Sequence, residues 1–124
     1  MGKIERGRII WLMKVIDTQG NSTKDHGAVI VTTASDYKAG KPIQAVYISS
    51  KLHHTSDDYM APLDWDPRGH PQTGLTQPSS VICDWRNKNV DEENILNFGK
   101  MVYGTKMDEI MEKVLAAQSK KSTQ

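Results

Sequence analysis

The chain has 124 residues, a length that suits one domain with its own hydrophobic core. Its net charge of +1 excludes a globally basic protein, so any contact with nucleic acid must use a local basic patch. The single cysteine, Cys83, excludes an internal disulfide and a zinc site built from cysteines. Because it has neither a membrane-length apolar run nor a beginning like a signal peptide, the sequence predicts a cytoplasmic protein with no membrane contact.

The first half of the chain predicts three strands separated by polar segments. Residues 9–16, 28–33 and 43–50 are rich in β-branched and other apolar side chains, which favours strands. The intervening residues 17–26 and 36–42 contain the Gly, Asn, Ser, Asp and Pro that are typical of loops and turns. We therefore expect a long polar loop between the first two strands and a turn before the third.

The second half predicts shorter strands. The signal is weak over residues 51–73, where a short strand is expected at 59–63. Residues 79–85 form the next expected strand. Asp91 is expected to cap a short helical turn, and a last strand follows at residues 97–103.

The end of the chain predicts an amphipathic helix. Thr105 followed by Asp108 resembles a capping box and marks the expected start. Apolar residues then recur at helical spacing and predict one buried stripe, made of Met107, Ile110, Met111, Val114 and Leu115. We expect residues 1–118 to form a single domain and residues 119–124 to be a disordered tail.

The strand at residues 79–85 carries the most informative pattern. Because side chains alternate across a strand, Val81, Cys83 and Trp85 are expected to face the core. Asp84 and Arg86 then project together from the opposite face, one pleat apart. An ordinary solvated pair would have the same spacing. In sum, five or six short strands and a closing helix predict a mainly β fold, a small antiparallel barrel with a C-terminal α-helix.

One group of residues suggests a metal site. His53, His54, Asp57 and Asp58 lie close together in the chain. Adjacent histidines on a strand point to opposite faces, however, and cannot easily share one ion. We therefore expect a solvated edge or a hairpin here, with no metal and no cofactor.

The order of these pieces resembles the MazF/PemK (Kid-like) family, the toxins of bacterial type II toxin–antitoxin pairs. Four short stretches carry the resemblance over nearly the whole chain: RGRIIW at residues 6–11, AVIVT at 28–32, AVYISS at 45–50 and GLTQPSSVICD at 74–84. It implies the SH3-like antiparallel β-barrel of the CcdB, MazF and PemK toxins, and a homodimer. It also implies a metal-independent endoribonuclease that cleaves single-stranded mRNA, inhibits growth and is held in check by a cognate antitoxin.

The resemblance also implies the site residues. The Arg that precedes Pro in the family falls at His26, which is followed here by Gly27. The Thr that ends the third strand in the family falls at Ser49, and the acid after Cys falls at Asp84. Many relatives carry another Arg after that acid, close to the position of Arg86. The catalytic candidates are therefore His26, Ser49, Asp84 and Arg86, and the RNA-binding candidates are Lys24, Gly27, Ser50, Lys51 and Lys88.

Metal-free cleavage of RNA needs a base for the 2′-OH, an acid for the leaving oxygen and donors for the phosphate. We expect Asp84 to be the base or to orient one, His26 to be the acid or base, and Arg86 to be the phosphate clamp. Ser49 would donate a hydrogen bond to the phosphate or contact the 2′-OH. The family also has an Arg two residues before the acid in its Kid branch, and Ile82 stands there. With these arginines replaced, the alternative is a catalytically weak or inactive toxin-fold protein that binds a protein target, as CcdB does.

Overall fold

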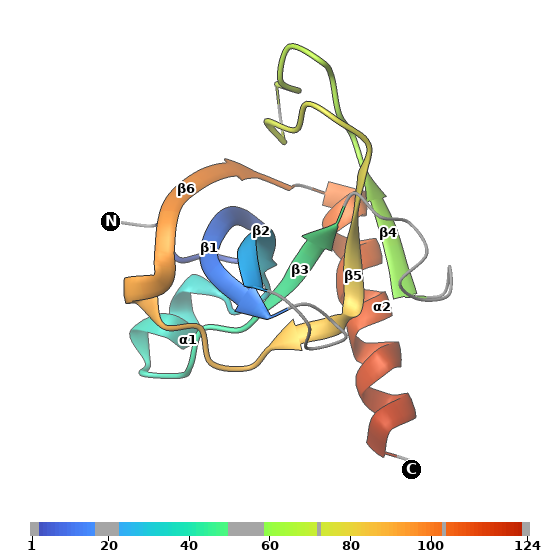
Figure 1. The fold of residues 1–124 in the computed structure, drawn as a ribbon. Helices are drawn as coiled ribbons and strands as arrows, with labels where there is room; N and C mark the ends of the chain where they lie inside the picture. The colour runs from blue at the N-terminus through green and yellow to red at the C-terminus, as the bar shows by residue number, and fades with distance from the viewer. Residues whose placement is uncertain (1–2, 17–22, 50–58, 72, 103, 123–124) are drawn as a thin grey trace.

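The computed structural model describes residues 3–16, 23–49, 59–71, 73–102 and 104–122 (Figure 1). The elements follow one another as β1 (Arg8–Ile16), β2 (Thr23–Ile30), α1 (Ala34–Lys38), β3 (Ala45–Ser49), β4 (Met60–Leu63), β5 (Ser79–Asn87), the 3₁₀ turn η2 (Glu92–Asn94), β6 (Ile95–Met101) and α2 (Gly104–Ser122). No helix among these residues is long and apolar enough to cross a membrane.

All six strands belong to one antiparallel sheet in the order β4-β5-β3-β2-β1-β6. The sheet curls strongly, and α2 packs beside β4 and β5 (Figure 1). Within the described residues β4 and β6 are its two edges, so the sheet is not closed into the barrel that the sequence predicts. The predicted mainly β fold with a C-terminal helix is confirmed.

The central strands are buried on both faces of the sheet. Ile9 and Val29 belong to a cluster on one face, where α2 contributes Ile110. Ile10 and Ile30 belong to a second cluster on the other face, inside the curl. Burial on both faces explains why these strands read as continuous apolar runs rather than as alternating patterns.

Two boundaries in the first half differ from the prediction. β2 begins at Thr23, so the end of the predicted loop, including His26, is strand. His26 pairs with Leu12 of β1, and this pairing gives a polar segment strand structure that its composition does not favour. In place of part of the predicted turn, α1 is capped by Thr33, whose hydroxyl accepts a hydrogen bond from the Asp36 amide at 3.1 Å.

The predicted alternation of side chains between the two faces of the sheet is found only in the first half of β5. Val81 and Cys83 lie in the cluster beneath α2, as predicted. Pairing with β3 then shifts, because Val81 lies opposite Ile48 but Arg86 lies opposite Val46. This irregularity breaks the alternation. Trp85 consequently packs against the cluster on the opposite face of the sheet, so its predicted position beside Val81 and Cys83 is wrong.

The helix α2 covers one face of the sheet with a narrower stripe than predicted. Met107, Ile110 and Val114 are buried, but Leu115 is 58% exposed, so its predicted place in the stripe is wrong. One residue C-terminal to Val114 on a helix is rotated by about 100°, which turns Leu115 toward solvent. The helix begins at Gly104 rather than at a Thr105 cap, and it continues to Ser122, into the predicted tail.

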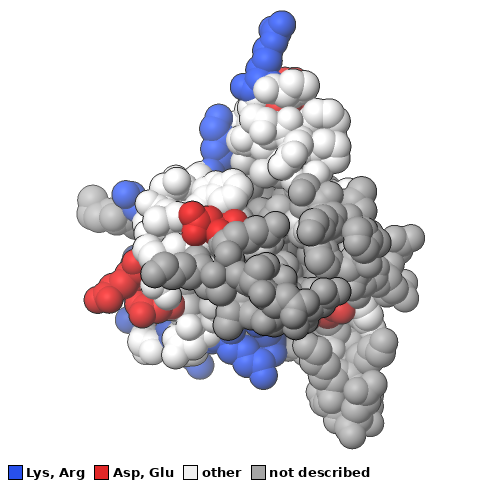
Figure 2. All heavy atoms as spheres, in the orientation of Figure 1, with Lys and Arg blue, Asp and Glu red and all other residues white. Residues whose placement is uncertain are grey.

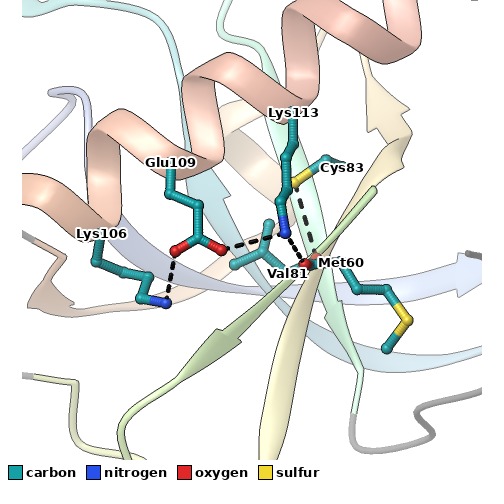
Figure 3. A network of polar contacts seen from close by, with 6 residues as sticks. All are labelled: Met60, Val81, Cys83, Lys106, Glu109 and Lys113. Carbon is teal, nitrogen blue, oxygen red and sulfur yellow. Dashed lines mark hydrogen bonds and ion pairs between the residues drawn. The ribbon is translucent and has the colours of Figure 1, made fainter. Parts of the chain in front are cut away.

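A polar network connects α2 to the edge strand β4 (Figure 3). The Glu109 carboxylate accepts hydrogen bonds from Lys106 Nζ at 2.8 Å and Lys113 Nζ at 3.2 Å, and Lys113 also donates to the Met60 carbonyl oxygen. The Lys106 hydrogen bond is the main cause of a lowered Glu109 pKa. The contribution of these pairs to stability is therefore present at neutral pH and decreases when acid protonates Glu109. Since the carboxylate is partly exposed, that contribution is modest.

The only cysteine lies in β5 beneath α2. Its Sγ is 3.8 Å from the Val81 carbonyl oxygen (Figure 3), and the side chain is 2% exposed. Burial raises the pKa of the Cys83 thiol to about 12, and the nearby positive charge of Lys113 opposes this rise only in part. Cys83 is therefore a neutral, inert part of the core.

The α2 interface predicts unequal effects of two matched truncations. Ile110 is fully buried and Leu115 mostly exposed, so Ile110→Ala should lower the free energy of unfolding by about 2–5 kcal/mol. Leu115→Ala should change it by less than about 0.5 kcal/mol. Urea denaturation of both variants measures the difference, and equal losses would show that α2 does not pack as described.

The raised pKa predicts protection of Cys83 from alkylation. Thiolate is the reactive form, so iodoacetamide near pH 8 should label the folded protein much more slowly than the protein in guanidinium chloride. Because the folded pKa is higher than the unfolded one, stability should decline as the pH rises above about 9 toward 12. Mass spectrometry follows the labelling. Rapid modification of the native protein would contradict the burial.

Candidate functional site

A cavity of about 260 Å³ lies where β2 begins and β3 ends. Residues 74–79, which lead into β5, complete its wall. We call it the His26 pocket, and it is lined by Trp11, Asp25, His26, Gly27, Ile48, Ser49, Gly74, Leu75, Thr76, Gln77 and Ser79. Its polar lining includes one carboxylate, one imidazole, three hydroxyls and a carboxamide, which are groups that transfer protons and donate hydrogen bonds.

The imidazole of His26 occupies the gap beyond the last residue pair between β2 and β3. That pair is Ala28 with Tyr47, after which the two strands separate. Nδ1 of His26 lies 3.3 Å from the Ile48 carbonyl oxygen. Since a carbonyl oxygen only accepts, this contact places a proton on Nδ1. The Nε2 atom is buried.

Two aromatic side chains hold the imidazole in place. The His26 ring meets the Trp85 ring edge to face, with centroids 5.1 Å apart and planes at 77°. The Tyr47 ring lies 6.3 Å from His26 and 4.6 Å from Trp85. These contacts restrict the rotation of the imidazole, so His26 is a fixed group rather than a solvated surface histidine.

Ser49 and Gly27 lie beside this imidazole in the same cavity. Ser49 is the last residue of β3, is 5% exposed, and pairs with Ser80 of β5. Gly27 pairs with Trp11 of β1, whose indole is 40% exposed. A Cβ atom on Gly27 would lie 3.5 Å from Ile48 Cδ1 and 3.7 Å from the Trp11 ring. Because Gly27 has no side chain, only its backbone lines the pocket at this point.

A second cavity, of about 400 Å³, lies beside the apolar cluster inside the curl. We call it the Arg86 pocket. It is lined by Leu12, Met13, Val15, Tyr47, Trp85, Arg86, Asn87, Lys88, Val90, Asp91 and Asn94. Trp85 lines this cavity and His26 lines the other, so the contact between their rings separates the two.

The structure brings together only part of the predicted site. Of the four catalytic candidates, His26 and Ser49 share one cavity, Arg86 lies in the other, and Asp84 lines neither. The predicted convergence of all four in one groove is therefore not found. The shifted pairing of β5 explains the separation, because it turns the end of that strand toward the inside of the curl.

The RNA-binding candidates are also divided between the cavities. Gly27 lines the His26 pocket and Lys88 lines the Arg86 pocket. Ser50 and Lys51 lie outside the described residues, as does the side chain of Lys24. The four residues weighed as a metal site, at positions 53, 54, 57 and 58, also lie outside the description.

Sequence reasoning missed several lining residues. Asp25 was part of a predicted loop, and Trp11 was read as one of a strand's apolar residues. The stretch around Gln77 carries the family resemblance but no predicted site residue. No local signal distinguishes Trp11, because its pairing with Gly27 is set by the sheet.

The surface charge agrees with the balanced composition. Figure 2 shows acidic and basic side chains interspersed over the described part of one face. The described residues on this face form no continuous field of one sign. Any attraction of a polyanion must therefore come from small groups of cations.

Comparison with known proteins supports a toxin fold. A scan of protein-family profiles and a search of curated proteins found no match to the sequence. The structure is similar to the Mycobacterium tuberculosis toxin MazF-mt6, with a TM-score of 0.67, 16% identity, and coverage of 92% of this chain and 97% of that chain. A structure described as an Mtb toxin is similar at a TM-score of 0.59 and 16% identity, covering 74% and 91% of the respective chains.

The chain therefore has the fold of MazF toxins. The resemblance to the MazF/PemK family that the sequence predicts is confirmed at the level of the fold.

The space beside Gly27 predicts a tolerated substitution. Gly27→Ala adds a methyl group at ordinary contact distances and should leave the melting temperature nearly unchanged. Gly7→Ala is the matched comparison, because Gly7 has a φ of +99° and its added Cβ would lie 2.6 Å from the Val102 carbonyl oxygen. That variant should lose more than about 1 kcal/mol. Thermal unfolding measures both, and a large loss in Gly27→Ala would contradict the described wall.

Proposed function

We propose that this chain is the toxin of a type II toxin–antitoxin pair and acts as a metal-independent endoribonuclease on single-stranded RNA. The observation that carries the proposal is the shared cavity of Asp25, His26 and Ser49 on a MazF toxin fold. These side chains supply two proton-transfer groups and a hydroxyl within one cavity. That set matches what cleavage by an internal nucleophile needs.

In this reaction the 2′-oxygen of one nucleotide attacks the adjacent phosphorus. The P–O2′ bond forms while the P–O5′ bond breaks, and no outside nucleophile is consumed. A base removes the proton from the 2′-OH, and an acid delivers a proton to the departing 5′-oxygen. The products are a 2′,3′-cyclic phosphate and a 5′-hydroxyl, so the atoms balance without a metal or a cofactor.

Asp25 and His26 are the groups assigned to proton transfer. Nδ1 of His26 lies 3.3 Å from the Ile48 carbonyl oxygen, which orients the imidazole that lines the cavity as the proposed proton-transfer group. Asp25 lines the same cavity and takes the role that the sequence suggested for Asp84. The ring contacts of His26 hold its imidazole in one orientation, which favours catalysis by positioning.

The phosphate and the base need separate contacts. Ser49 and Gln77 line the pocket and can donate hydrogen bonds to phosphate oxygens. Lys24 and Lys51 flank these positions in the sequence and remain the proposed cations for the phosphate charge. The exposed indole of Trp11 offers a surface on which one RNA base can stack.

As a toxin, the chain would act in the cytoplasm as a homodimer and would be inhibited by its cognate antitoxin. RNA cleavage would stop growth when the antitoxin is absent. A short reading frame next to the gene, encoding an acidic or DNA-binding protein, supplies the antitoxin candidate. Co-expression of that protein should restore growth.

The proposal predicts cleavage of a long single-stranded RNA by the purified protein in EDTA. His26→Ala and Ser49→Ala should each reduce the rate on the order of 100-fold or more, because each removes a reacting or stabilising group. Denaturing gels measure the rate, and end analysis should find 2′,3′-cyclic phosphates.

His70→Ala and Ser35→Ala are the matched controls. Both residues lie outside the His26 pocket, so cleavage by these variants should equal that of the wild type. Intact RNA in the presence of folded wild-type protein would remove the ribonuclease proposal and favour a toxin-fold protein that acts by binding. Full activity in His26→Ala would remove this site.

A further inference from the structure

The Arg86 pocket is not used in the cleavage chemistry described above, and its lining combines cations, aromatic rings and amides. We propose that it is a second nucleotide subsite, which holds a phosphate and a base of the single-stranded RNA away from the bond that is cleaved. This inference rests on the proposed function, and it changes the role of Arg86 from a catalytic clamp to a binding residue.

The cations lie at the end of β5. Arg86 is the penultimate residue of that strand and Lys88 follows it, and both line the cavity. Within the described residues neither makes an ion pair. A planar guanidinium and a lysine ammonium side by side suit the oxygens of a phosphate group.

The one acidic residue in the lining is already engaged in local structure. Asp91 caps η2, where its Oδ1 accepts a hydrogen bond from the Glu93 amide at 3.0 Å. The lining therefore carries two positive charges from Arg86 and Lys88 against one negative charge that is directed toward a backbone amide. The cavity favours an anion over a cation.

The aromatic rings form a fixed wall. The rings of Tyr47 and Trp85 are tilted at 43° to each other, with centroids 4.6 Å apart. Asn87 Nδ2 donates a hydrogen bond to the Tyr47 hydroxyl at 3.1 Å, and Asn87 Oδ1 accepts one from the Asn89 amide at 3.0 Å. Tyr47 is buried and supports the partly buried Trp85 ring, which offers the stacking surface for a base.

The amide side chains of the lining can form hydrogen bonds with the edge of a base. Asn94 lies in the same lining, and a carboxamide both donates and accepts, as the edges of bases do. At about 400 Å³ the cavity lies within the range of small-ligand sites. A phosphate alone would not use the rings and amides, so a nucleotide accounts for the whole lining.

The two cavities are neighbours on either side of the contact between His26 and Trp85. His26 lines the first and Trp85 the second, and their ring centroids are 5.1 Å apart. A strand with its reacting nucleotide beside His26 would have to pass around these rings to reach Arg86. Binding at a distance from the reacting bond would increase affinity and select the sequence that is cut.

The test is binding of a fluorescently labelled all-2′-deoxy oligonucleotide of about ten nucleotides, which cannot be cleaved because it lacks the 2′-OH. The double variant Arg86→Ala/Lys88→Ala should weaken binding at least about tenfold. Each lost phosphate contact should also lower the salt slope of log K by about 0.7. Trp85→Phe, which keeps a ring for packing, should weaken binding without changing the salt slope.

The matched control is Lys38→Ala/Lys41→Ala, which removes the same net charge from exposed positions at α1 and after it. It should bind like the wild type. Equal weakening by both double variants would show a general charge effect and overturn the subsite. Unchanged binding by Arg86→Ala/Lys88→Ala would overturn it as well.

The two proposals fail in distinguishable ways. Wild-type cleavage with unchanged binding in the Arg86/Lys88 variant would retain the ribonuclease and remove the subsite. Specific binding that depends on these residues, without cleavage by the wild type, would retain the subsite and remove the ribonuclease.

Titration with a mononucleotide then separates RNA from a free nucleotide as the natural ligand. Binding of an acidic peptide in preference to the oligonucleotide would overturn the assignment to RNA.

Discussion

Backbone pairing between β2 and β3 stops at Ala28 and Tyr47, and the imidazole of His26 fills the gap beyond it. The contact between Nδ1 and the Ile48 carbonyl oxygen joins the two strands there through a side chain. One side chain therefore both contacts the neighbouring strand and lines a cavity. The contact of His26 with Trp85 then separates this cavity from the Arg86 pocket.

This arrangement depends on a sheet that is buried on both faces. The helix α2 covers one face, and the curl encloses the other, so the interior of each central strand is occupied by packing. Polar chemistry is left to the strand ends, where pairing stops and side chains reach solvent. The packed strand interiors therefore form a rigid scaffold, and the strand ends carry the reactive groups. Functional residues of many proteins lie in such segments at the ends of a rigid scaffold.

The candidate site was partly accessible from the sequence. His26, Gly27 and Ser49 were named from the family resemblance, and all three line one cavity. Asp84 and Arg86 were joined on a face by strict alternation, an assumption that the shifted pairing of β5 breaks. Asp25 and Trp11 became visible only through the pairing of β1 with β2, because nothing local sets a loop-like aspartate or a strand tryptophan apart.

The sequence by itself determined the mainly β fold, the place of most strands and the amphipathic closing helix, because apolar periodicity and turn residues act over a few neighbours. The tertiary structure decided where β2 begins, which way Trp85 faces and how the catalytic candidates divide between two cavities. These features depend on pairing between strands far apart in the chain. A slip in that pairing moves a side chain to the other face without any change in local sequence.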